Sequence, residues 1–144
     1  GMEIEAKSVN NAFFPKVSNI TLRRAAGTVT EAGNPLEIDS FQFKKEGNGE
    51  YTNVVISGYT TSNTTLTATA VRIQDKSTND NQVTGGKIKM LNVKINDGTS
   101  QFAGVGTTFT VAFPTGNYTT SNTATGATLT AGAWAIVDGV SLIK

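Results

Sequence analysis

Hydrophobic and polar side chains alternate over short stretches along most of the chain. Residues 2–9 and 107–113 show this period-two pattern most clearly. Period two is the side-chain period of a β-strand that buries one face. No stretch of helical length repeats apolar residues every 3.6 positions, and the abundant Thr, Val and Ile favour strands over helices. The pattern therefore predicts an all-β protein.

Segments rich in Gly and Asn separate the alternating stretches, at residues 33–35, 46–49 and 96–98. Such segments are typical of turns. The turn at 46–49 is expected to join strands at 41–45 and 51–57 as a hairpin. About ten short strands at roughly even spacing predict an antiparallel β-sandwich, with jelly-roll or immunoglobulin-like topology.

Three further segments carry specific expectations. Phe13, Phe14 and Pro15 stand together and are expected to form a buried corner. Residues 74–86 are the least apolar part of the chain, which predicts a long exposed loop. Residues 87–96 are predicted to form a strand whose apolar residues change parity part-way, which indicates an irregularity such as a bulge.

One hexapeptide, Tyr-Thr-Thr-Ser-Asn-Thr, occurs twice, at residues 59–64 and 118–123. The similarity between the two copies extends over residues 51–75 and 109–138. It predicts an internally duplicated strand–turn–strand unit in a pseudo-symmetric sandwich. On one interpretation, both copies serve only as packing units.

The other interpretation is that the two hexapeptides are polar tips at the same end of the sandwich and form a paired binding surface. Tyr suits stacking on sugar rings, while Thr and Asn suit sugar hydroxyls or the surface of a neighbouring subunit. The candidate binding residues are Tyr59, Thr61, Asn63, Tyr118, Thr120 and Asn122.

The composition fits one domain with a weakly charged surface. A length of 144 residues predicts a single domain over residues 2–144, with Gly1 as a remnant of tag removal. Charged residues make up only 16% of the chain. The net charge is +1 and the 12 basic residues are dispersed, so binding to nucleic acid is not expected. No apolar run approaches membrane-spanning length, so no membrane partner is expected either.

The residue types that carry most protein chemistry are scarce. The chain has no Cys and no His, which excludes thiol catalysis and removes the commonest general base and zinc ligand. The 11 acidic residues form no local catalytic motif. We therefore predict that the protein is not an enzyme, with no catalytic residues and no cofactor. Residues 75–81 are rich in oxygen ligands but lack the Gly and terminal Glu of an EF-hand calcium loop. We therefore expect a solvated loop there and no metal site.

The end of the chain carries one resemblance to a known family. Residues 134–142 read Trp-Ala-Ile-Val-Asp-Gly-Val-Ser-Leu, with a tight turn expected at Asp138 and Gly139. This stretch resembles the closing strand of galactose-binding-like jelly rolls, a superfamily that includes many carbohydrate-binding modules. The resemblance implies jelly-roll topology and brings no binding residue with it.

These observations favour a non-enzymatic structural or adhesion protein, with a virion fibre, tail or capsid-decoration component as the specific expectation. Thr/Gly/Asn-rich strands of low charge suit proteins that work outside cells, whereas residues 2–7 show no signal peptide. Virion proteins reach the outside by cell lysis and need none. The expected partners are further copies of the chain, in a homo-oligomer or larger assembly. The alternative is a carbohydrate-binding module of jelly-roll type, with a glycan as partner.

Overall fold

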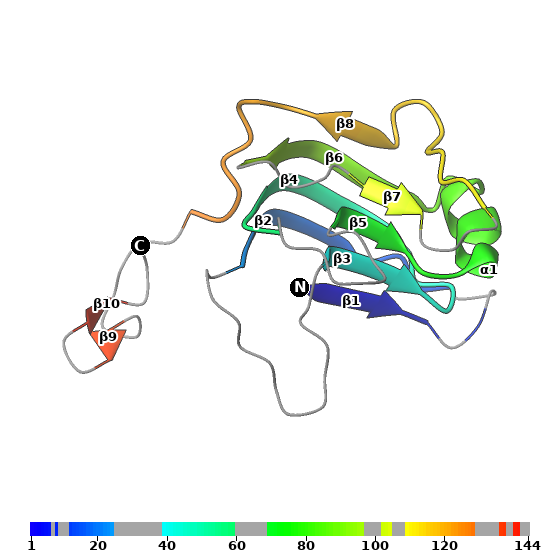
Figure 1. Cartoon of the computed structure of the whole chain (residues 1–144), viewed down its shortest axis with the longest axis horizontal. Helices are drawn as coiled ribbons and strands as arrows, with labels where there is room; N and C mark the ends of the chain where they lie inside the picture. Colours follow the sequence, from blue (N-terminus) through cyan, green and yellow to red (C-terminus); the bar gives the residue numbers. More distant parts are fainter. Residues whose placement is uncertain are drawn as a thin grey trace.

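The structure is a computed structural model, and it describes residues 1–6, 8, 12–24, 39–59, 69–96, 102–104, 109–128, 136–137 and 140–141. This part of the chain contains ten strands and one short helical segment (Figure 1). Eight of the strands form two four-stranded sheets, and the last two form a separate pair.

The two large sheets contain alternate strands of the chain. The odd sheet has the order β1 (Met2–Glu5), β3 (Asp39–Lys44), β5 (Thr69–Ile73) and β7 (Phe102–Gly104). The even sheet has the order β2 (Lys16–Arg23), β4 (Gly49–Ser57), β6 (Ile88–Ile95) and β8 (Tyr118–Thr120). Every pair of neighbours in both sheets is parallel.

The backbone therefore winds as a solenoid, passing from one sheet to the other and back. The arrows of the odd sheet point in the opposite direction to those of the even sheet (Figure 1). We call one odd strand and the following even strand a rung, so that β1 and β2 form the first rung and β7 and β8 the fourth. Each rung stacks on the one before it, which gives the parallel register within both sheets.

The expected antiparallel β-sandwich is wrong, and with it the jelly-roll or immunoglobulin-like topology. Phe41 pairs in parallel with Met2 on one side and with Val71 on the other. The expected hairpin is also wrong, because β3 and β4 belong to different sheets and residues 45–48 carry the chain between them. Period-two alternation shows which face of a strand is buried, but it is the same for parallel and antiparallel neighbours.

The core lies between the two sheets and is densest in the second and third rungs. Its fully or almost fully buried side chains are Phe41, Phe43, Val71 and Ile73 from the odd sheet, and Tyr51, Val54, Ile56, Ile88, Met90 and Val93 from the even sheet. The Tyr51 ring packs in a T-shaped arrangement with the rings of Phe41 and Phe43, with centroids 5.5 and 5.6 Å away. Edge-to-face packing of this kind adds to the free energy gained by burying the rings.

Three asparagines stack at one level of the even sheet and bend its strands. Asn19, Asn53 and Asn92 have left-handed backbones, with φ of 59, 56 and 58°. Asn adopts this conformation more readily than other residues with a Cβ. Each of these asparagines is an extra residue that shifts the alternation of inward and outward side chains by one position, so that Tyr51 and Val54 both face the core. The predicted irregularity in residues 87–96 is thereby confirmed, since the register shifts between Met90 and Val93.

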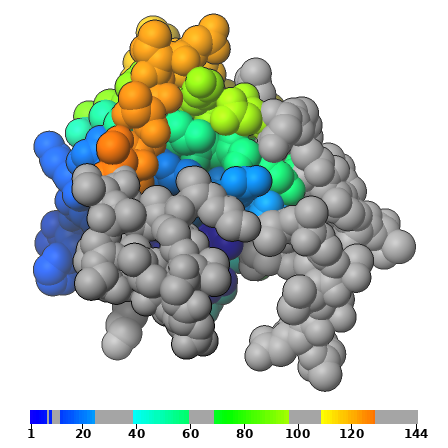
Figure 2. All heavy atoms as spheres, turned by 90° about the vertical axis from the view of Figure 1, so that its left-hand side faces the viewer, coloured from blue at the N-terminus to red at the C-terminus, as the bar shows by residue number. Residues whose placement is uncertain are grey.

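The chain after β8 crosses back over this row of asparagines. The backbone N–H groups of Thr125 and Gly126 donate to Asn53 Oδ1 at 2.9 and 3.3 Å, and Ala127 N–H donates to Thr21 Oγ1 at 2.9 Å. Asn53 Nδ2 in turn donates to Asn19 Oδ1 at 2.7 Å. Figure 2 shows this segment in orange as it runs down from the region of β8. It therefore ties the fourth rung to the first two.

The expected loop at residues 74–86 is wrong, and its expected exposure holds only in part. It contains α1 (Lys76–Thr78) and a π-helical turn, η1 (Asn79–Val83). Thr78, Gln82 and Val83 are fully buried. The polar composition of the segment suggested exposure, but two of these buried residues are polar and hydrogen-bonded, as buried polar groups usually are.

The last two described strands, β9 (Ile136–Val137) and β10 (Val140–Ser141), pair antiparallel, as a turn between them requires. The two residues expected to form that turn lie outside the described part. In the ranges that the structure describes, no helix combines the length and the apolar composition needed to cross a membrane. The single domain over residues 2–144 stays a prediction.

Candidate functional site

The residues predicted to bind a ligand lie in different environments. Tyr59 follows the end of β4 and is only 3% exposed. Tyr118 begins β8, is half-buried, and packs on Phe113 with ring centroids 5.6 Å apart. Burial raises the pKa of Tyr118 to about 12. Thr120 and Asn122 are exposed, whereas the other two predicted residues, Thr61 and Asn63, lie outside the described residues.

The structure does not bring Tyr59 and Tyr118 together. Tyr118 is in register with Met90, and Met90 with Tyr51, so Tyr118 lies at the level of Tyr51 in the even sheet. Tyr59 is eight residues further along, beyond the end of a strand that runs parallel to β8. Tyr59 and Tyr118 are therefore at opposite ends of this sheet, and glycan binding at the six residues stays a prediction.

The sequence repeat does not match the repeat of the structure. Tyr118 corresponds in register to Tyr51, not to Tyr59 with which the hexapeptide aligns it. The expected duplication of a strand–turn–strand unit in a pseudo-symmetric sandwich is therefore wrong. The unit that repeats in the structure is the rung. Equivalent positions of successive rungs hold different residues, and one column of the even sheet, for example, contains Val17, Tyr51, Met90 and Tyr118.

Oxygen ligands in residues 75–81 are used within the protein. Asp75 caps α1, with its carboxylate accepting from Thr78 N–H at 2.8 Å and from Lys45 N–H at 2.9 Å. Asp80 forms an ion pair with Lys76. Within the described ranges, no three acidic side chains gather as a metal-ion site would require.

Glu46 is a buried carboxylate held by neutral donors. The hydroxyl of Ser77 donates to Oε1, as does Asn81 Nδ2 at 3.1 Å, and Gln82 Nε2 donates to Oε2 at 2.7 Å. Burial raises the pKa of this carboxyl, but the hydrogen bonds from Ser77, Gln82 and Asn81 outweigh it and hold the pKa below its usual value.

The charge of Glu46 sets the direction of a chain of amides. A carboxylate only accepts, so Gln82 must turn its Nε2 toward Glu46 and its Oε1 toward Asn48. Asn48 Nδ2 donates to that oxygen at 3.1 Å. The network joins the turn between β3 and β4 to the helical segment, and its role is therefore to hold these two elements together.

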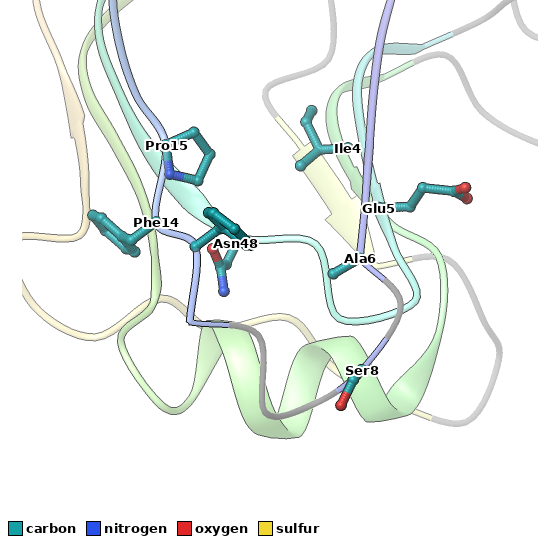
Figure 3. Close-up of a pocket in the computed structure, with 8 residues that line it drawn as sticks. Ile4, Glu5, Ala6, Ser8, Phe14, Pro15 and Asn48 are labelled. Atoms are coloured by element: carbon teal, nitrogen blue, oxygen red, sulfur yellow. The ribbon is translucent and has the colours of Figure 1, made fainter.

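At the first rung, the strands that the structure describes leave one end of the core open. A pocket of about 640 Å³ lies between the end of β1 and the segment that leads into β2 (Figure 3). Ile4 and Ala6 line it from one side and Pro15 from the other, with Asn48 at its base. Its lining is mainly apolar, as expected for core side chains that no described strand covers.

Exposed aromatic rings stand beside this pocket. The Phe13 side chain is 82% exposed and that of Phe14 is 38% exposed, although both line the pocket. The expected buried corner at Phe13–Pro15 is therefore wrong. Adjacent Phe residues next to a proline were the one signal of this site in the sequence, but they were assigned to the core.

A more polar hollow of about 890 Å³ adjoins the pocket and shares Glu5, Ala6 and Ser8 with it. Glu5 forms ion pairs with Lys44 at 3.5 Å and with Lys45 at 3.1 Å. The hydrogen bond and charge of Lys45 hold the pKa of Glu5 below its usual value. The rim of the first rung is therefore charged on one side and apolar on the other.

Comparisons with known proteins give no family for this arrangement. No protein-family model matches the chain, and neither curated proteins nor solved structures gave a match. The resemblance of residues 134–142 to the closing strand of galactose-binding-like jelly rolls has no support from these comparisons, and the jelly-roll topology it implied is overturned by the parallel sheets.

Proposed function

We propose that this is a non-enzymatic structural or adhesion protein that works within an assembly, with a virion fibre, tail or capsid decoration as its setting. The observation that carries the proposal is the open first rung. In the part of the chain that the structure describes, β1 and β2 each have a strand partner on one side only. Unpaired strand edges beside exposed aromatic rings favour association with another chain.

The use of the acidic residues supports a structural role. All seven carboxylates of the described residues have a hydrogen-bonding or ion-pair partner within the protein; they are Glu3, Glu5, Asp39, Glu46, Glu50, Asp75 and Asp80. Asp39, for example, is buried and forms an ion pair with Arg72, which is buried too. Asp39, Glu46 and Asp75 thereby hold parts of the fold together, whereas the exposed pairs of Glu3, Glu5 and Asp80 contribute little to stability.

Sedimentation velocity at increasing protein concentration tests the proposal. We expect the protein to self-associate into a defined oligomer or a longer assembly. A strict monomer at the highest attainable concentration would contradict it. Proteomic analysis of virus particles purified from the source culture tests the setting, since the protein is expected among the particle components and its absence would remove the virion assignment.

A further inference from the structure

We propose that two copies of this chain associate through their first rungs, around a two-fold axis parallel to the strands. In this arrangement β1 of each copy pairs antiparallel with β2 of the other, and each Phe13 ring enters the apolar pocket of its partner. This rests on the proposed function and names the partner in the assembly as a second copy of the chain.

The first rung carries both halves of a self-complementary contact. Phe13 is the most exposed large hydrophobic side chain of the described residues, at 82%. It stands on the rim of a pocket of about 640 Å³, which is large enough for a phenyl ring and is lined by Ile4, Ala6 and Pro15. When a projecting group and the hollow that fits it lie side by side, a two-fold axis between them satisfies both at once.

The direction of the strands selects the axis. The strands of the odd and even sheets run in opposite directions (Figure 1), so an axis parallel to them brings β1 against the partner's β2 in antiparallel orientation. That axis also keeps the pocket ends of the two copies together. An axis passing through both sheets would instead place β1 against the partner's β1. It would also put the Phe13 of each copy at the end of the partner's first rung that lacks the pocket.

Charge favours the same arrangement. Glu5 ends β1 and Lys16 begins β2, and both are exposed. Antiparallel pairing of β1 with the partner's β2 brings these opposite charges across from each other, twice per dimer. The axis through both sheets would set Glu3 and Glu5 near the same residues of the partner, and like charges facing each other across strands are destabilising.

Cross-linking of single-cysteine variants tests the geometry directly, because the chain has no cysteine of its own. With Glu5 opposite the partner's Lys16, Glu3 lies opposite Ser18. We expect an equimolar mixture of Glu3→Cys and Ser18→Cys proteins to form a covalent heterodimer on mild oxidation, and neither variant alone to cross-link at a comparable rate. A Glu3→Cys homodimer as the main product would overturn the proposal in favour of β1 against β1.

Substitutions at the contact give a second readout, in sedimentation equilibrium of the full chain. Phe13→Ser is expected to weaken the dimer at least tenfold, whereas Phe13→Leu keeps an apolar group and most of the affinity. Lys16→Glu should weaken it similarly, and Arg23→Glu is the matched control, since it makes the same charge change on β2 beyond the overlap with β1.

The outcomes separate the two proposals. A wild-type protein that oligomerises with unchanged affinity in Phe13→Ser and Lys16→Glu would refute this interface and leave the proposed function standing. A wild-type protein that stays monomeric would refute both. Circular dichroism of each variant checks that a lost dimer is not a lost fold.

Discussion

The first rung and the second rung occupy the same columns of the odd sheet but differ in burial. Met2 pairs with Phe41 and Ile4 with Phe43, so each pair points to the same core. Both phenylalanines are fully buried, whereas Met2 and Ile4 are only half-buried. Among the strands that the structure describes, the second rung has a neighbouring rung on both sides and the first rung on one side only.

This difference shows that burial follows a residue's place in the stack more than its own hydrophobicity. The inward side chains of β2 follow the same rule. Val17 is 38% exposed although Tyr51, its neighbour in the column, is 2% exposed. The exposed apolar surface of the first rung is thus core surface that no described strand covers, which is why we assign it to association.

The largest effect should come from truncating a side chain in the second rung. Phe43→Ala removes a fully buried ring and is expected to lower the free energy of unfolding by about 3–5 kcal/mol. Ile4→Ala, at the neighbouring position of the first rung, should cost only about 1 kcal/mol at concentrations where the protein is monomeric, because solvent already reaches the side chain. Urea denaturation of both variants measures the difference, and equal losses would show that the first rung is as well covered as the second.

An intermediate effect is expected at the row of asparagines. Asn53→Gly keeps the left-handed backbone but loses the bonds to Asn19, Thr125 and Gly126, and should cost about 2 kcal/mol. Asn19→Gly in the first rung loses only the bond to Asn53 Nδ2 among the side-chain bonds of the described residues, so about 1 kcal/mol or less is expected. Thermal unfolding monitored by circular dichroism compares the two. A larger loss at Asn19 would contradict the order.

The smallest effects on stability are expected at the carboxyl groups, and acid titration compares a buried carboxyl with an exposed one. In the folded protein the pKa of Glu46 lies below its usual value of about 4.5. The ionised carboxylate therefore stabilises the fold above about pH 4.5, and this contribution is lost as the pH falls through the pKa of the folded state. Urea midpoints measured from pH 7 down to pH 3 should fall for the wild type and fall less for Glu46→Gln.

Glu5→Gln is the matched control in the first rung. The pKa of Glu5 is lowered as well, by Lys45, but the side chain is exposed and solvent screens the pair. We therefore expect its acid profile to follow that of the wild type. A profile that flattens in Glu5→Gln and not in Glu46→Gln would place the acid-sensitive group at the rim.

The positions of several strands could be predicted from the sequence, but their partners could not. The stretches that became β1, β2 and β6 were recognised from alternation and from the change of parity in residues 87–96. Whether neighbouring strands are parallel or antiparallel depends on the path of the chain between them. The strand β2 lies between β1 and β3 along the chain, and its sequence gives no local signal of which sheet it joins. Exact repetition misled as well, because the hexapeptide aligned Tyr118 with Tyr59 and the sheet aligns it with Tyr51.

The candidate site was hidden for a related physical reason. Phe13 and Phe14 have the composition of a core, and only the absence of a covering rung in the described structure leaves them exposed. In residues 74–86 the error was the opposite one. Gln82 and Thr78 look like solvated side chains, but hydrogen bonds to Glu46 satisfy them inside the protein.

The coiled path also sets the order in which the molecule can form during synthesis. The strands β1 and β2 leave the ribosome before their partners β3 and β4, so the first rung cannot pair with the second until residues 39–57 have been made. The turn at residues 45–48 is the shortest connection between the sheets, which makes the second rung the natural starting point for folding. The first rung is then added backwards, onto a second rung that has already formed.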